Sequence, residues 1–172
     1  MPLYSSIKGL PPLIDEKSRF LILGTIPGRK SLEQKQYYAD PRNHFWEIMK
    51  ILFGIDPKLP YHERAEELLK RGIALWDVLA SCDRTGSSDK EIQNPKPNDI
   101  ESFLQSHPST KKVFFNGNRP KDFARKIMPG LLRETRYGFI VLPSSSSSNT
   151  HSSVSHKAGV WKVLKENCSN AS

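Results

Sequence analysis

Four short apolar runs, each followed by a turn or a polar loop, most constrain how this 172-residue chain can fold. The runs are FLILGT, ALWDVL, KVFFNG and GFIVLP, at residues 20–25, 74–79, 112–117 and 138–143. They are continuously apolar rather than alternating, which is typical of strands covered on both faces. Segments with helical spacing separate them, and strands that alternate with helices form parallel sheets. The sequence therefore predicts a three-layer α/β/α fold around a four-stranded parallel sheet.

The helical segments carry their own start and stop signals. Apolar residues at helical spacing precede Gly54 and Gly72, and both glycines can end a helix. Asn43 is placed to start the first of these helices, whose Phe45 faces the core. Three further signals predict a capping box at Asn98 and Glu101, a helix through Phe123 and Ile127 that ends before Pro129–Gly130, and a last helix capped by Ser155.

Length and composition predict one globular domain. At 172 residues, with 37% hydrophobic and 26% charged residues, the chain is long enough to bury a substantial core. We expect residues 1–172 to form a single domain in which 166–172 is a frayed tail. No run of about 18 apolar residues occurs, and the N-terminus lacks the pattern of a signal peptide. We therefore expect an intracellular protein with no membrane segment, and we separately expect it to be a monomer.

The cysteines and histidines argue against a bound metal. Cys82 and Cys168 are the only cysteines, and neither belongs to a C-x-x-C pair. The five histidines form no H-x-x-x-H pair, and the zinc-deaminase signature is missing. We expect chemistry that needs neither a metal nor a cofactor.

The net charge is compatible with a nucleic-acid partner. There are 26 Lys and Arg against 18 Asp and Glu, which gives +8 and a pI near 9.5. A pI above about 9 is typical of nucleic-acid-binding domains. A generically basic, well-solvated surface has the same composition, so charge alone does not decide between the two.

The ends of the predicted strands carry the unusual chemistry. In open α/β sheets, ligands bind beyond the carboxyl ends of the strands. GTIPGRKS follows the first strand but is not a phosphate-binding P-loop, because three residues rather than four separate Gly24 from Gly28 and Arg29 precedes Lys30–Ser31. It is either a tight structural turn or a loop whose backbone amides face a ligand. The polar loop 80–99 is a further candidate wall of the site.

The stretch QYYADPRNHFW, residues 36–46, is the most informative. Tyr38 lies in a predicted loop before Asp40–Pro41, where it either packs in the core or offers its ring to a ligand. Asn43 is either an ordinary helix cap or a catalytic amide. Neither residue can be assigned from this stretch alone.

A serine-rich loop follows the fourth strand. Ser144, Ser145, Ser146, Ser147, Ser148 and Asn149 come directly after a buried strand, which a flexible linker does not do. Hydroxyls and backbone amides that lead into a helix near Ser155, with His156 and Lys157 at its start, are suited to gripping phosphates.

Taken together, these motifs resemble the uracil-DNA glycosylase superfamily. GTIPGRKSLEQKQYYADPRNHFW, GIALWDVLASCDRTGSSDKEI, VFFNG and LPSSSSSN are most similar to its hypoxanthine-DNA glycosylase family, family six. The resemblance covers residues 4 to 165. It implies a monofunctional DNA glycosylase that flips a deaminated base out of double-stranded DNA and hydrolyses its N-glycosidic bond.

The resemblance also implies roles for individual residues. Asn43 would be the catalytic residue that orients water, Tyr38 would stack on the flipped base, and Ile26 occupies a position where a related branch has a water-binding Asn. The chain departs from the family at Ser147–Ser148, where Pro-Ala is usual, and has Ser144 where other branches have His or Asn. The base-binding set is Gly24, Thr25, Ile26, Pro27, Gly28 and Tyr38, and Ser144 to Asn149 with Lys157 would clamp the DNA.

Several alternatives stay open from the residues alone. Asp77, Ser81, Cys82 and Asn116, near the ends of the second and third strands, are secondary candidates for reading the base, and Asp77 is equally an ordinary strand-end residue. Hypoxanthine is the expected base, with uracil, particularly opposite guanine, as its main rival. A non-catalytic DNA-binding module and a small-molecule nucleoside hydrolase are the competing functional classes.

Overall fold

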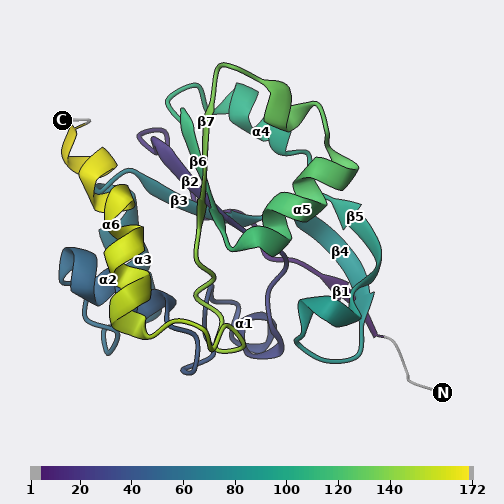
Figure 1. The fold of residues 1–172 in the computed structure, drawn as a ribbon, viewed down its shortest axis with the longest axis horizontal. Helices are drawn as coiled ribbons and strands as arrows, with labels where there is room; N and C mark the ends of the chain where they lie inside the picture. The colour runs from purple at the N-terminus through teal and green to yellow at the C-terminus, as the bar shows by residue number, and fades with distance from the viewer. Residues whose placement is uncertain (1–4, 171–172) are drawn as a thin grey trace.

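The structure, a computed structural model, describes residues 5–170 and is built around a parallel sheet of four strands. The strands are β2 (Phe20–Gly24), β3 (Ile73–Asp77), β6 (Lys112–Asn116) and β7 (Gly138–Leu142), in the order β3-β2-β6-β7. Their bounds lie within one or two residues of the four predicted runs. Helices cover both faces of this sheet (Figure 1), which confirms the predicted three-layer fold.

The central strand β2 shows why the chain forms two separate cores. All five of its residues are buried, and successive side chains of a strand point to opposite faces. Phe20 and Ile22 belong to one hydrophobic cluster, whereas Leu21 and Leu23 belong to the other. A strand that must satisfy both clusters has no polar position, which explains its continuous apolar run.

The helices divide between these two clusters. Helices α2 (Phe45–Phe53), α3 (Tyr61–Lys70) and α6 (Val154–Asn170) bury side chains in the first cluster, and they lie on the left of the sheet in Figure 1. Helices α4 (Ile100–Ser106) and α5 (Asn118–Ile127) pack in the second cluster. The short α1 (Arg29–Gln34) directly follows the loop after β2, and two 3-10 turns, η1 (Asp89–Glu91) and η2 (Leu131–Arg133), complete the elements.

A second, antiparallel sheet was not predicted. Strands β1 (Ser5–Lys8), β4 (Leu79–Arg84) and β5 (Gln93–Pro97) pair in the order β1-β4-β5. Leu79 therefore begins a new strand instead of ending the predicted strand 74–79, and the predicted loop 80–99 contains β4 and β5. These strands are short, partly exposed and polar, and β5 contains two prolines, so their sequences lack the apolar pattern that reveals a buried strand.

Three helix boundaries also differ from the prediction. Asp99, not Asn98, caps α4, because its carboxylate accepts from the Ser102 amide. Ser153, not Ser155, caps α6, because its hydroxyl accepts a hydrogen bond from the backbone N–H of His156. Residues 166–170 are the last part of α6 rather than a frayed tail, and 171–172 lie outside the described residues. Within residues 5–170, no helix is long and apolar enough to cross a membrane.

Candidate active site

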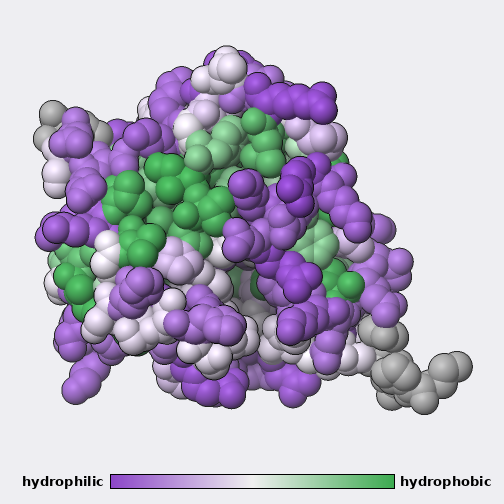
Figure 2. Space-filling model, in the orientation of Figure 1, coloured by the Kyte–Doolittle hydropathy of each residue, from purple (hydrophilic) through white to green (hydrophobic). Residues whose placement is uncertain are grey.

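A cleft of about 770 Å³ opens at the carboxyl ends of the parallel strands. Four loops form its walls: the loop after β2, the segment that leads into α2, the loop between β4 and η1, and the serine loop, residues 144–149. In Figure 2 the surface is hollowed near the middle of the face, between near-white residues and strongly hydrophilic ones. The residues that line the cleft are Gly24–Ser31, Tyr37, Tyr38, Asp40, Arg42, Asn43, Asp77, Gly86–Lys90, Asn116, Arg119 and Ser144–Ser148.

The loop of residues 24–28 turns its carbonyl groups toward the protein. The carbonyl oxygens of Gly24 and Thr25 accept from the amides of Val78 and Leu79. The carbonyl of Pro27 accepts from the buried guanidinium of Arg84 at 2.7 Å. The amides of Ile26 and Gly28, in contrast, donate to no residue within the described range 5–170. Hydrogen bonds to its carbonyl groups therefore fix the loop, and the N–H groups of Ile26 and Gly28 are available to a ligand in the cleft.

Tyr38 is fixed on one ring face and at its hydroxyl. Its ring stacks on Phe45, with centroids 4.1 Å apart and planes inclined by 19°. Its hydroxyl oxygen accepts from Nδ2 of Asn116 at 3.1 Å. The backbone φ of Tyr38 is 55°, a left-handed conformation that is uncommon for an aromatic residue. Burial raises the pKa of the hydroxyl, so the ring stays neutral. Tyr38 is thus both packed and cleft-lining.

Asn43 lies two residues before α2, which begins at Phe45 with His44 as its N-cap rather than at Asn43 as predicted. Its Oδ1 accepts from the amide of Phe45 at 2.9 Å, which satisfies one of the free donors at the start of α2. The residue also lines the cleft, and its Nδ2 donates to none of the residues 5–170. The helix therefore fixes the orientation of this side chain and leaves its NH₂ group for a ligand or water.

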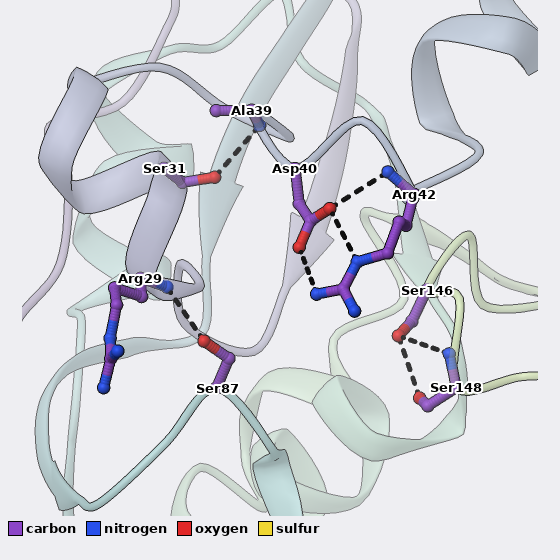
Figure 3. Close-up of polar contacts among 8 residues, drawn as sticks. All are labelled: Arg29, Ser31, Ala39, Asp40, Arg42, Ser87, Ser146 and Ser148. Atoms are coloured by element: carbon purple, nitrogen blue, oxygen red, sulfur yellow. Dashed lines mark hydrogen bonds and ion pairs between the residues drawn. The ribbon is translucent and has the colours of Figure 1, made fainter.

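Hydrogen bonds within the serine loop and to Asn116 fix its conformation. Ser145 is buried, and its amide and hydroxyl both bond to the side chain of Asn116. The hydroxyl of Ser146 accepts from the amide of Ser148 at 3.3 Å and bonds to its hydroxyl at 2.9 Å, as Figure 3 shows. Ser147 and Ser148 are exposed. The loop is therefore ordered by its own hydrogen bonds and presents its tip to solvent.

Lys157 supports the serine loop from beneath. Its side chain is fully buried, and its Nζ lies 3.1 Å from Nδ1 of His44 and 3.2 Å from the carbonyl oxygen of Ser146. Burial and the neighbouring Lys157 lower the pKa of His44, which keeps the imidazole neutral as an acceptor. Lys157 thus lies below the surface that the exposed serines form, and it connects the loop to the residue next to Asn43.

Two carboxyl groups that line the cleft have raised pKa values. Asp77, at the end of β3, is buried, and its Oδ2 has no hydrogen-bond partner among the described residues. Burial raises its pKa to about 7. Asp89, in η1, is close enough to affect it and also has a raised pKa because of burial. Both carboxyls are therefore more readily protonated than exposed ones.

The rim of the cleft is predominantly basic. Arg29, Lys30, Arg42, Lys90 and Arg119 line the cleft, against Asp40, Asp77 and Asp89, of which Asp77 is buried. Arg42 pairs with Asp40 at 2.8 Å, lowering the pKa of that carboxyl to about 2, and Figure 3 shows the pair between α1 and the serine loop. The hydroxyl of Ser87, from the loop before η1, accepts from the amide of Arg29. These exposed cations are suited to the phosphates of a nucleic acid.

The predicted site residues mostly converge on this cleft. The whole 24–28 loop, Tyr38, Asn43, Asp77, Asn116 and Ser144–Ser148 line it, whereas Ser81, Cys82, Asn149 and Lys157 do not. Ser81 and Cys82 lie on β4 in the second sheet, and Asn149 binds the carbonyl of Ser144. Arg84 and Asp89 were not indicated by the sequence, because charged residues in a polar loop are expected to be exposed to solvent. Among residues 5–170, no group of histidine, cysteine and acidic side chains could hold a metal ion.

Comparisons with known proteins agree with this geometry. A family model described as the uracil DNA glycosylase superfamily matches residues 11–165. A hypoxanthine DNA glycosylase of Methanosarcina barkeri is 35% identical over 159 residues, which is 92% of this chain and 98% of the relative. A hypoxanthine DNA glycosylase of Methanosarcina acetivorans is 32% identical over 158 residues, or 91% and 96% of the two chains.

A solved structure shows the same fold. The solution NMR structure of a protein from Methanosarcina acetivorans, described as a uracil DNA glycosylase, superposes with a TM-score of 0.81 and 30% identity. The match covers 96% of this chain and 99% of the other. Sequence, fold and cleft therefore agree that the chain belongs to the uracil DNA glycosylase superfamily and is a DNA glycosylase.

Proposed function

We propose that this DNA glycosylase is monofunctional, acts on double-stranded DNA and removes deaminated bases by hydrolysis, with hypoxanthine as its main substrate. The two Methanosarcina relatives named hypoxanthine DNA glycosylase support this choice of base. The observation that carries the proposal is the convergence of Asn43, Tyr38 and the free amides of the 24–28 loop on one cleft. We further propose that the chain works as a single-domain, intracellular monomer.

In this proposal the flipped base lies against Tyr38. Phe45 covers one face of the Tyr38 ring, and the residue lines the cleft. Stacking of a base on an aromatic ring contributes about 1–3 kcal/mol, which offsets part of the cost of extruding the base from the duplex. Because Asn116 holds the hydroxyl, the ring does not have to be ordered when the base arrives.

Asn43 positions the water that attacks the sugar. Cleavage of the glycosidic bond develops positive charge on the sugar, so an attacking water needs orientation more than it needs a strong base. The Oδ1 of Asn43, bonded to the amide of Phe45, retains a second lone pair, and its NH₂ group has no partner among residues 5–170. This amide can therefore hold a water without any movement of the helix.

The 24–28 loop stabilises the departing base. Negative charge develops on the base as the bond breaks, and preorganised N–H donors stabilise such charge. The amides of Ile26 and Gly28 are available for this role, while the Arg84 guanidinium fixes the carbonyl of Pro27 behind them.

The serine loop and the basic rim hold the DNA backbone. Ser147 and Ser148 are exposed at the loop tip, and Arg42 and Arg119 flank the cleft. Hydroxyls and arginines are common phosphate contacts. Lys157 contributes indirectly, because it keeps the Ser146 carbonyl in place.

Base release under excess enzyme tests the proposal. Duplexes that carry hypoxanthine, uracil or xanthine opposite each normal base are incubated with the protein, and the free base is measured in single-turnover reactions. Faster release of hypoxanthine than of uracil supports the proposed substrate. Release of uracil without hypoxanthine would refute it while leaving glycosylase activity intact, and release of no base would favour a non-catalytic DNA-binding module.

A further inference from the structure

The most unusual side chain in the cleft is Asp77. Strands β2 and β3 run parallel with Gly24 opposite Asp77, so the end of β3 places this carboxyl beside the 24–28 loop. Asp77 is only 5% exposed, it lines the cleft, and its Oδ2 has no partner within residues 5–170. A buried oxygen without a hydrogen-bond partner is costly, and in a cleft it indicates a ligand that supplies one.

Gly24 makes room for this carboxyl. A Cβ at Gly24 would lie 2.5 Å from Oδ1 of Asp77 and 3.4 Å from the hydroxyl oxygen of Tyr38. Both atoms therefore border the same small space at the bottom of the cleft, beside the proposed stacking ring. An incoming base that stacks on Tyr38 would bring its edge to Asp77.

The surroundings of Asp77 favour its neutral form. Burial is the main cause, and the neighbouring Asp89 acts in the same direction. Arg84 is the nearby cation and acts in the opposite direction, but its effect is the smallest of the three. Its Nη2 donates to the carbonyl of Pro27, and its Nε and Nη1 have no partner among the described residues. Asp77 in turn raises the pKa values of Tyr37 and Tyr38. The carboxyl therefore still carries its proton in a substantial fraction of molecules near neutral pH.

Protonation stabilises a purine as it leaves the sugar. When the bond between C1′ and N9 breaks, its electron pair moves into the imidazole ring of the base, where it is conjugated with N7. A proton delivered to N7 neutralises that charge, and a buried carboxylic acid can supply it.

We propose that Asp77 is the general acid of the reaction and donates its proton to N7 of the flipped 6-oxopurine as the glycosidic bond breaks. This inference rests on the proposed function. The C1′–N9 bond breaks, its electrons stay on the base, and N7 takes the Asp77 proton. Water held by Asn43 adds to C1′, its proton leaves to solvent, and the carboxylate is reprotonated from solvent before the next turnover.

The first test is the pH dependence of single-turnover hypoxanthine release. The wild-type rate is expected to be highest below neutral pH and to fall about tenfold per pH unit once the carboxyl has lost its proton. Asp77→Asn keeps the shape and a hydrogen-bond donor but cannot release a proton. We expect it to be slower by on the order of 10²-fold near pH 6 and nearly independent of pH.

A second substrate locates the proton acceptor. In 7-deazahypoxanthine a carbon replaces N7, so Asp77→Asn is expected to cost little on that base. Asp56→Asn, an exposed change in the loop after α2 that keeps the acceptor for the Lys58 amide, is the control and should behave as wild type on both substrates.

Three results would overturn the inference. The first is a wild-type rate that rises with pH through 7, as expected if an ionised Asp77 only accepts a hydrogen bond from N1–H of the base. The second is a pH–rate profile of Asp77→Asn that runs parallel to that of wild type. The third is an equal loss of rate for Asp77→Asn on hypoxanthine and on 7-deazahypoxanthine. Each differs from failure of the proposed function, in which the wild-type protein releases no hypoxanthine at any pH.

Discussion

Asn116 donates from its Nδ2 to the hydroxyl oxygen of Tyr38 at 3.1 Å, and the same side chain holds both the amide and the hydroxyl of Ser145. One amide at the end of β6 therefore positions the proposed stacking ring and the base of the serine loop together.

This relationship predicts the effect of changing Tyr38. The resemblance alone suggests that only the ring face matters, so that Tyr38→Phe would be silent. Because the hydroxyl bonds to Asn116, we expect Tyr38→Phe to slow single-turnover release several-fold, corresponding to about 1 kcal/mol. Tyr38→Ala also loses the stacking surface and should lose a further 10-fold or more. A wild-type rate for Tyr38→Phe would show that the hydrogen bond between Tyr38 and Asn116 does not contribute to base release.

Gly24 predicts a steric effect on the same site. Gly24→Ala would place a methyl group 2.5 Å from Oδ1 of Asp77, so we expect the carboxyl to be displaced and base release to fall by at least tenfold. Gly159→Ala in α6 is the matched control, because, apart from its chain neighbours and the adjacent backbone of its own helix, no atom of residues 5–170 lies within 4 Å of its added methyl group. That change should leave the rate unaltered and stabilise the helix by about 0.5–1 kcal/mol. Equal rates for the two variants would contradict the assigned geometry.

Lys157 and Arg42 should differ in how they affect DNA binding. Arg42 is exposed on the rim, so Arg42→Gln should reduce the slope of log affinity against log salt concentration by about one. Lys157 is buried under the serine loop, so Lys157→Met should slow base release without changing that slope. Lys162→Met, an exposed change on the same helix, controls for loss of charge. A reduced slope for Lys157→Met would instead place its ammonium group on a phosphate.

Asp77 predicts a pH-dependent stability. Its pKa is raised from 3.8 to about 7 in the folded protein, so the folded state binds this proton more tightly than the unfolded state does. The free energy of unfolding should therefore decrease as the pH rises from about 4 to about 7, by up to about 4 kcal/mol, and then level off. Urea unfolding at pH 5 and pH 8 checks this. Asp77→Asn should gain stability over wild type at pH 8 and not at pH 5, and a constant difference at both pH values would argue against a buried, titrating carboxyl.

The sequence predicted the parallel sheet well because buried strands leave a strong signal. In β2, two apolar clusters require an apolar residue at every position, so the run can be read directly. The second sheet was missed because β4 and β5 are partly exposed and need no such pattern. The sequence also predicted Tyr38, Asn43 and the 24–28 loop as one site, but only through the resemblance of the whole block to a family.

Other parts of the site depend on contacts that no local pattern encodes. Lys157 was expected on the DNA-binding surface, yet it is buried, and its Nζ donates to the carbonyl of Ser146 and to His44, which lies 113 residues away in the sequence. Arg84 gave no signal for burial, since its partner Pro27 lies on another element. Asp77 could be named as a candidate, but its isolation from any partner became visible only in three dimensions.

The most direct measurement of the central claim is free hypoxanthine released from a hypoxanthine-containing duplex by excess wild-type protein, compared with Asn43→Ala. We expect wild type to release the base and Asn43→Ala to be slower by on the order of 10²-fold with nearly unchanged DNA affinity. Asp99→Ala, which removes the cap of α4 away from the cleft, controls for a lost helix cap and should retain the wild-type rate. An Asn43→Ala variant that releases hypoxanthine as fast as wild type would contradict the proposed catalytic role, and a wild-type protein that releases none would contradict the proposed substrate.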